Sequence, residues 1–327
     1  CDWSSDVCSS DLTHGNDAFL LTGARQIGKT YLIRQCLKES GYPYIEFNFI
    51  EQPELVNLFA GAKDAKELLM RLSVVAKEPL EQGKTIIFLD EIQEFKDIVT
   101  RIKFLVEDGT FRYIMSGSLL GVELNDLRSA PVGYLEIYDM YPLDFEEFLW
   151  ANGIGEAVID SVKSCFENEK AVPDGIHKAM MELLYRYVIV GGLPEVVNCF
   201  LETKNIELIY KVQRNLIAEY EEDMVKYADD PDKPRIRECF ESIPKQLAKE
   251  NKKFQYSVVK KGGRASQYIG SIQWLEDAGI VRRCYNTQIT ELPLEGNSIK
   301  DCFKVYTTDI GVLVAMLDYG MKLIGSK

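Results

Sequence analysis

Short apolar runs alternate with amphipathic segments through the first half of the chain. The runs typical of strands cover residues 18–22, 44–49, 85–89, 111–115 and 134–138. Apolar positions recur with helical spacing over residues 31–37, 64–77 and 98–106. Strands that alternate with helices in this way predict an α/β fold built on a mostly parallel, doubly wound sheet.

After Trp150 the strand pattern stops and helical patterns dominate. They cover residues 179–188, 206–227, 236–250 and 265–278, and a linker rich in Asp and Pro lies at residues 229–234. Two final strands are expected at residues 280–285 and 303–306. Helix, helix and hairpin predict a winged-helix-like region. We expect a core at 13–150, a helical lid and linker at 151–232, and the winged-helix-like region at 233–327.

The first twelve residues, CDWSSDVCSSDL, do not resemble the rest of the chain. They repeat Ser-Ser-Asp and have neither the basic nor the apolar segment of a signal peptide. They resemble a translated sequencing adapter, so residues 1–12 are interpreted as a non-native leader. A genuine N-terminal tail is the alternative.

The segment GARQIGKT at Gly23–Thr30 fits the pattern G-x-x-x-x-G-K-[ST] at every fixed position. It follows a strand and opens a helix, the context that a phosphate-binding P-loop requires. Glycines let backbone N–H groups turn toward phosphate oxygens, and the helix N-terminus adds positive charge. Lys29 is expected at the β- and γ-phosphates and Thr30 at Mg²⁺. The predicted nucleotide-binding residues are Gly23, Ala24, Arg25, Gln26, Ile27, Gly28, Lys29, Thr30 and Tyr31.

Two acids follow the buried strand at residues 85–89, in the segment TIIFLDEIQ. Ligands of open α/β sheets bind at the carboxyl ends of strands, where these acids lie. Asp90 is therefore predicted to hold Mg²⁺ through water, and Glu91 to act as the general base that polarises the attacking water. The alternative is a strand that ends in solvated acids.

Ser116-Gly117-Ser118 follows the strand at residues 111–115. A polar side chain at this strand tip, from either serine, would lie between the two motif strands and sense the γ-phosphate. The alternative is a turn made of turn-forming residues.

Composition limits which classes of protein this chain can belong to. The chain of 327 residues carries a net charge of −13, so any nucleic-acid surface must be local. No apolar run is long enough to span a bilayer, and we expect no membrane partner. Eight Cys without a CxxC pair are typical of reduced thiols, which predicts a cytoplasmic protein.

One local basic cluster lies in the winged-helix-like region. It contains Lys245, Lys249, Lys252, Lys253, Lys260, Lys261 and Arg264, followed by Arg282 and Arg283. These side chains could contact DNA phosphates. A solvated helix face, or a docking surface for an acidic part of the same chain, remains open, because no base-reading motif is legible.

The order of the motifs resembles a large family of bacterial and archaeal ATPases in the AAA superfamily, most of them uncharacterised. The resemblance is carried by GARQIGKT, the strand ending LDEIQ, YIMSGSLLG at Tyr113–Gly121, YPLDFEEFL at Tyr141–Leu149, and GGLPEVV at Gly191–Val197. Phe240–Ser257 and Trp274–Val281 also resemble that family's middle region. Together these segments cover most of the chain from Ala18 to Leu317.

The resemblance implies an AAA-type ATPase with ATP and Mg²⁺ as ligands. By matching positions it implies Lys29 and Thr30 at the phosphates and metal, Asp90 and Glu91 at the metal and water, and Ser116 as the sensor. It also implies a homo-oligomer, because AAA-type sites usually form between subunits.

Two features depart from the family pattern. Members usually continue into a C-terminal domain with a restriction-endonuclease-like fold, whose carboxylate-rich core is not visible here, so the C-terminal domain is expected to be truncated. Many members carry Gly-Arg after the sensor strand, where this chain has Ala130–Tyr134 with Arg128 nearby. Arg25 is the alternative cation near the phosphates.

Two functions are therefore weighed. The first is Mg²⁺-dependent ATP hydrolysis, which an intact Glu91 favours. The second is a slow nucleotide-dependent switch whose winged-helix region binds DNA or a protein partner, which the basic cluster favours. A small-molecule kinase is a third and weaker reading, since the helical C-terminal half offers little material for an acceptor pocket.

Overall fold

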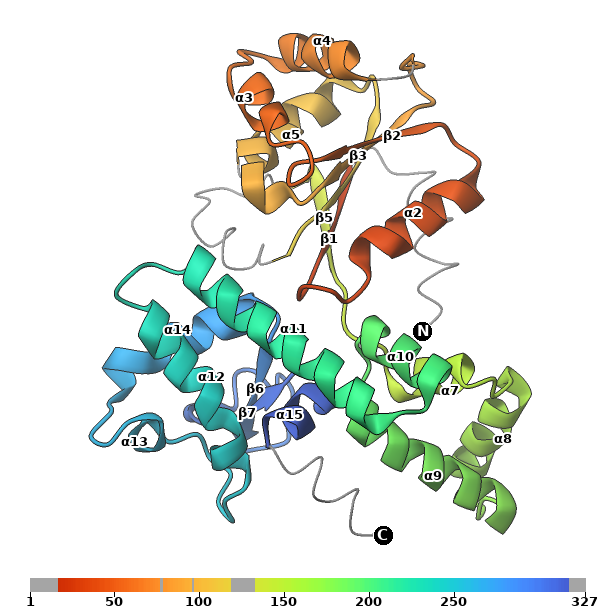
Figure 1. Ribbon diagram of the computed structural model, residues 1–327, viewed down its shortest axis with the longest axis vertical. Coiled ribbons are helices and arrows are strands. Elements are labelled where there is room, and N and C mark those ends of the chain that lie inside the picture. The colour runs from red at the N-terminus through yellow and green to blue at the C-terminus, as the bar shows by residue number, and fades with distance from the viewer. Residues whose placement is uncertain (1–16, 77–78, 96, 119–132, 318–327) are drawn as a thin grey trace. The chain divides into compact units, whose positions relative to one another are not determined.

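A computed structural model describes residues 17–76, 79–95, 97–118 and 133–317 (Figure 1). The leader at residues 1–12, the segment around Arg128 and the end of the chain lie outside the described residues. The chain divides into two compact units, unit 1 up to Met140 and unit 2 from Tyr141 onward. Each unit is described by itself.

Unit 1 is built on one parallel sheet. Its strands are β1 (Ala18–Thr22), β2 (Tyr44–Asn48), β3 (Ile86–Asp90), β4 (Arg112–Ser116) and β5 (Leu135–Asp139). Their order across the sheet is β2-β3-β4-β1-β5, and all neighbouring pairs are parallel. The predicted α/β fold is confirmed, and β4 lies between the strand that leads into the P-loop and the strand that ends in Asp90.

Helices cover both faces of this sheet (Figure 1). They are α2 (Lys29–Ser40), α3 (Glu54–Ala60), α4 (Ala65–Val75) and α5 (Asp97–Asp108), with the short 3-10 helix η2 (Ile92–Phe95) after β3. Side chains alternate along β3: Ile87 and Leu89 join the core shared with α3, α4 and α5, while Ile86 and Phe88 join the core shared with α2. A strand buried on both faces must be apolar throughout, which explains its continuous hydrophobic run.

Unit 2 is mainly helical. Its first part contains α7 (Phe145–Ala151), α8 (Glu156–Glu167), α9 (Asp174–Val190), α10 (Pro194–Thr203) and α11 (Ile206–Tyr227). Asp144 and Glu147 form a reciprocal capping box at the start of α7, because each side chain accepts a backbone N–H of the other residue. The sequence pattern did not predict α8 or α10.

The second part of unit 2 combines helices with a hairpin. It contains α12 (Lys233–Leu247), α13 (Tyr256–Val259), α14 (Ala265–Asp277), β6 (Val281–Thr287), β7 (Ser298–Thr307) and α15 (Ile310–Met316). β6 and β7 are antiparallel, with a register shift after Tyr285. Their inner face, which includes Phe303 and Val305, is buried. β7 extends further toward its start than the sequence indicated.

Three distant segments of unit 2 meet at the Gly-Gly pair that ends α9. Gly192 donates its N–H to Asp309 Oδ2 at 2.6 Å and accepts from the Leu143 N–H at 2.8 Å. Asp309 Oδ1 also accepts from the Val312 N–H at 2.9 Å, which starts α15. Burial raises the pKa of Asp309, against the opposing effect of these backbone hydrogen bonds. The approach is so close that a Cβ on Gly192 would lie 1.9 Å from the Leu143 carbonyl oxygen.

No helix among the described residues is long and apolar enough to cross a membrane.

Gly192→Ala is expected to lower the free energy of unfolding by about 3 kcal/mol or more, because the new Cβ overlaps backbone that no rotamer change can move. Urea unfolding followed by circular dichroism measures this. Gly270→Ala is the matched control: it lies in α14 with nothing within 4 Å of its Cβ position, and it should stabilise by about 0.5–1 kcal/mol. Equal stability of both variants would contradict the close packing around Gly192.

Candidate functional site

The loop between β1 and α2 turns sharply at its glycines. Gly23 has φ +139°, and a Cβ there would lie 2.4 Å from the Met140 carbonyl oxygen. Gly28, just before α2, has φ +96°, a conformation that side chains rarely adopt. Gln26 also has a positive φ of 61°. The two motif glycines are therefore required by the backbone, as the P-loop pattern predicts.

Lys29 lies under this loop. Its side chain is 8% exposed, and Nζ donates to the carbonyl oxygens of Gly23 at 3.1 Å and Ala24 at 2.7 Å. Burial lowers the pKa of Lys29 to about 8, although the negative charges of Glu91 and Asp90 act in the opposite direction. A buried ammonium whose hydrogen-bond partners among the described residues are carbonyl oxygens is suited to exchange them for an anion.

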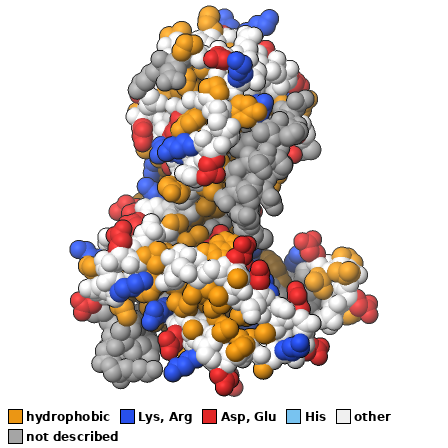
Figure 2. Space-filling view, turned by 90° about the vertical axis from the view of Figure 1, so that its right-hand side faces the viewer, with side chains coloured by type: hydrophobic (Ala, Val, Ile, Leu, Met, Phe, Trp, Pro, Cys, Tyr) orange, Lys and Arg blue, Asp and Glu red, His pale blue; other side chains and the backbone are white. Residues whose placement is uncertain are grey.

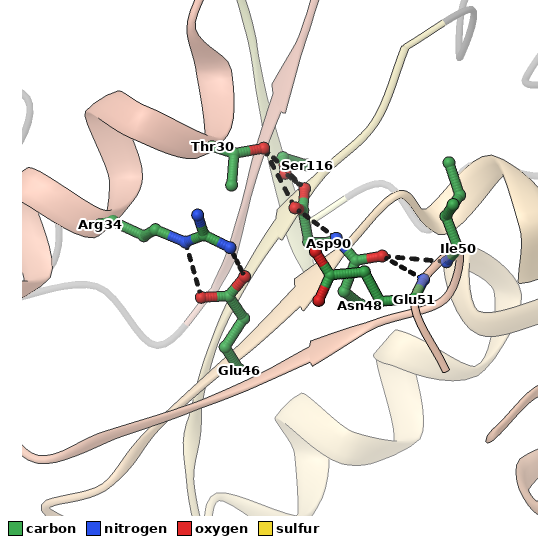
Figure 3. A network of polar contacts seen from close by, with 8 residues as sticks. All are labelled: Thr30, Arg34, Glu46, Asn48, Ile50, Glu51, Asp90 and Ser116. Atoms are coloured by element: carbon green, nitrogen blue, oxygen red, sulfur yellow. Dashed lines mark hydrogen bonds and ion pairs between the residues drawn. The ribbon is translucent and has the colours of Figure 1, made fainter. Parts of the chain in front are cut away.

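Asp90 is the centre of the site. It is 2% exposed and ends β3. Its carboxylate accepts hydrogen bonds from Thr30 Oγ1 at 3.0 and 3.2 Å, from Asn48 Nδ2 at 3.0 Å and from the Ser116 hydroxyl (Figure 3). These donors come from α2, β2 and β4, so one buried carboxylate joins three elements at the same edge of the sheet.

A second layer supports this network (Figure 3). Asn48 Oδ1 accepts the backbone N–H groups of Ile50 and Glu51, each at 2.9 Å, which fixes the turn after β2. Arg34 of α2 pairs with Glu46 of β2, with Nε 2.9 Å from Oε2. Both interactions tie β2 to its surroundings and hold the Asn48 amide on Asp90.

Glu91 directly follows Asp90 with a positive φ of 57°, an uncommon conformation for a residue other than glycine. Burial raises the pKa of Glu91, and the negative charge of Asp90 adds to this; a hydrogen bond from the Gln93 amide opposes it. The carboxyl group is therefore partly withdrawn from water and biased toward binding a proton, as a general base requires.

The side chains of the predicted nucleotide-binding residues differ in solvent exposure. Ala24 and Ile27 are buried, so their side chains pack inward and a ligand in the loop could meet only their backbone. Arg25 is exposed, and Tyr31 of α2 is 75% exposed. The structure brings Lys29, Thr30, Asp90 and Ser116 together, whereas the Tyr31 ring lies in solvent.

The sequence analysis missed Asn48 and Gln93. Asn48 ends the strand next to β3, with Asn48 and Asp90 in register. Its position at the carboxyl end of a strand was the available signal. To conclude from it that Asn48 lies beside Asp90, one must also know that β2 and β3 are neighbours. Gln93 was part of the LDEIQ motif, but nothing in the spacing indicated that η2 turns its amide back to Glu91.

The donor set suits Mg²⁺ more than a transition metal. Among the residues that the structure describes, no group of three or more His, Cys, Asp and Glu could hold a metal ion by itself. One carboxylate and one hydroxyl, Asp90 and Thr30, are an oxygen set of the kind that holds Mg²⁺ together with substrate phosphates. The residues present therefore fit Mg²⁺ bound with a nucleotide.

Comparisons with known proteins agree with the fold. Residues 15–149 match a family described as an AAA domain, and residues 181–322 match a domain of unknown function (DUF8612). Unit 1 therefore has the P-loop ATPase fold of AAA proteins. The second match does not show the restriction-endonuclease-like domain that the resemblance implied. No curated protein matches this chain.

Solved structures give distant similarities. A Walker-type ATPase of Pyrococcus abyssi is 16% identical, with a TM-score of 0.56 over 96% of this chain and 95% of that chain. ORC1 of Aeropyrum pernix in complex with DNA is 15% identical, with a TM-score of 0.33 over 92% and 86% of the two chains. AMPPCP-bound DnaA of Aquifex aeolicus is 10% identical, with a TM-score of 0.36 over 83% and 86%. The first shows a shared fold; the other two score too low to do so.

Asn48→Ala is expected to lower the free energy of unfolding by about 1–3 kcal/mol, because it removes a donor from buried Asp90 and the acceptor of the turn after β2. Urea unfolding measures the loss. Asn57→Ala, at an exposed position of α3, is the matched control and should change stability by less than about 0.5 kcal/mol. A loss no larger than the control's would contradict the supporting role of Asn48.

Proposed function

We propose that unit 1 binds ATP with Mg²⁺ and hydrolyses it. The observation that carries the proposal is the convergence of Thr30, Asp90 and Ser116 at one edge of the parallel sheet, with Lys29 buried beside them. Hydroxyl, carboxylate and ammonium at a glycine loop are the groups that phosphoryl chemistry requires. The choice of adenine follows from the family resemblance and the AAA domain match.

Lys29 and the loop backbone would bind the phosphates. Lys29 Nζ would leave the carbonyl oxygens of Gly23 and Ala24 and donate to phosphate oxygens, which carry a full negative charge and are better partners. The N–H groups of residues 23–30 and the start of α2 would add donors and a positive potential. Buried Ala24 and Ile27 contribute through their backbone.

Thr30 and Asp90 would hold Mg²⁺, the hydroxyl directly and the carboxylate through water. The ion, when bound, supplies positive charge that balances the phosphate oxygens. The direct hydrogen bond between Thr30 and Asp90 would open to admit it. Ser116, hydrogen-bonded to Asp90 from β4, would sense the γ-phosphate.

Glu91 would accept the proton of the attacking water. Its elevated pKa makes it a better proton acceptor than an ordinary carboxylate, and it directly follows the residue that holds the metal. A catalytic cation from a neighbouring subunit would complete a site shared within a homo-oligomer. Arg25, exposed in the loop, is the alternative within the chain.

A second candidate function concerns unit 2. The seven members from Lys245 to Arg264 are exposed, and of these only Lys260 pairs with an acid among the described residues, with Nζ 2.9 Å from Glu238 Oε1. Arg283 is half-buried and pairs with Glu276. On the face drawn in Figure 2, basic and acidic side chains are interspersed. A local basic surface on a winged-helix-like arrangement favours DNA, bound through its phosphates and in response to the nucleotide state.

Lys29→Ala is expected to lose ATP binding, because it removes the cation at the phosphates, while Glu91→Gln should bind ATP but hydrolyse it at least about a hundredfold more slowly. Calorimetry and phosphate release, each with Mg²⁺ and at several protein concentrations, measure the two properties. Lys38→Ala, an exposed lysine in the last turn of the same helix, is the control and should behave as the wild type. ATP binding by Lys29→Ala equal to that of the control would refute the P-loop assignment.

Reversing three lysines of the basic cluster tests the second function. The variant Lys249→Glu, Lys252→Glu, Lys253→Glu should weaken binding of double-stranded DNA and reduce the slope of log affinity against log salt by up to about 3. The matched control reverses Lys170, Lys178 and Lys211, three exposed lysines elsewhere in unit 2, and therefore has the same net charge as the test variant. An equal loss of DNA affinity in both variants, or no DNA binding by the wild type at low salt, would exclude the basic cluster as a DNA-binding surface.

A further inference from the structure

Gln93 connects the segment after β3 with the segment after β4. It lies in η2, directly after the Asp90-Glu91 pair, and its side chain is 4% exposed. Its amide Nε2 donates to Glu91 Oε2 and to Ser118 Oγ, the latter at 3.4 Å. Both hydrogens of one buried amide group are therefore assigned to partners on two different segments.

The other end of the same amide is unusual. Gln93 Oε1 is buried and has no hydrogen-bond partner among the described residues. Native structures retain few such atoms, and each one calls for an explanation. Glu91, two residues earlier, has a positive φ. Both features are unfavourable, and unfavourable features that persist side by side are concentrated at functional sites.

Ser116 at the end of β4 and Ser118 just after it are thus connected to the two acids of the site. Ser116 donates to Asp90 directly, and Ser118 is connected to Glu91 through the Gln93 amide. β4 pairs with both β1, which leads into the phosphate loop, and β3, which ends in the acids. A displacement of the β4 end would therefore move the partners of Asp90 and Glu91 together.

We propose that Gln93 is a positioning residue, which directs the Glu91 carboxylate and makes its position depend on the segment that contains Ser116 and Ser118. This inference rests on the proposed hydrolytic function. It assigns Gln93 no contact with the nucleotide. The amide acts by donating to the carboxylate: a residue of the same length without donors fills the space but leaves Glu91 undirected.

The test compares Gln93→Met, Ser118→Ala and the double variant with the wild type. Gln93→Met keeps most of the side-chain volume and removes both donors. We expect it to lower kcat for ATP hydrolysis about 10- to 100-fold, the range expected when a general base is misaligned. Its affinity for a non-hydrolysable ATP analogue with Mg²⁺ should stay within about twofold of wild type, because the hydrogen bonds of Gln93 among the described residues go to Glu91 and Ser118, neither of which is assigned to the phosphates.

Two further readouts separate positioning from a structural role. Because Ser118 acts through Gln93, the double variant should be no slower than Gln93→Met alone. Without nucleotide, the thermal unfolding midpoint of Gln93→Met should equal or exceed that of wild type, since the substitution removes the buried unpartnered Oε1. Gln35→Ala, an exposed glutamine on α2, is the control for loss of an amide and should change neither turnover nor affinity.

Turnover of Gln93→Met within twofold of wild type would overturn the inference, and so would losses that multiply in the double variant. A lowered unfolding midpoint with unchanged turnover would assign Gln93 a purely structural role. Failure of the proposed hydrolytic function would give a different result: wild type would hydrolyse ATP no faster than Glu91→Gln.

Discussion

A carboxylate withdrawn from water must be hydrogen-bonded, and Asp90 satisfies this requirement with donors from three separate elements. Asn48 and Ser116 reach it because β2, β3 and β4 are parallel neighbours whose carboxyl ends meet at one edge, and Thr30 reaches it from the start of α2, after the loop that follows β1. The P-loop, the strand order and the turn after β2 are therefore parts of one constraint. An unpaired buried charge would be costly, so the same contacts that could admit a metal and phosphates also hold unit 1 together.

The sequence predicted those features that are determined by residues close together in the chain. The continuous apolar run of β3 and the glycines of the phosphate loop each depend on neighbouring residues, and the structure contains both. Short helices were harder to predict. α3 has only seven residues, and α10 begins with Pro194 inside a motif noted only for its resemblance.

Non-local contacts could not be predicted from spacing. Asn48 was missed because its hydrogen bond to Asp90, 42 residues later in the chain, depends on the pairing of β2 with β3. Asp309 was missed because its partner Gly192 is 117 residues away. The resemblance marked GGLPEVV as a motif, and the structure supplies the reason: Gly191 approaches Asp309, and Gly192 approaches Leu143, too closely for any side chain. Gln93 depended on the path of η2, which sets its amide against Glu91.

The central claim is that Asp90 organises a joint site for Mg²⁺ and ATP. Calorimetric titration of ATP into the whole chain, with and without Mg²⁺, tests it most directly when wild type and Asp90→Ala are compared. We expect one site per chain, at which Mg²⁺ strengthens ATP binding at least about tenfold in wild type and has little effect in Asp90→Ala. An equal effect of Mg²⁺ in the two proteins, or no saturable ATP binding by wild type, would contradict the account.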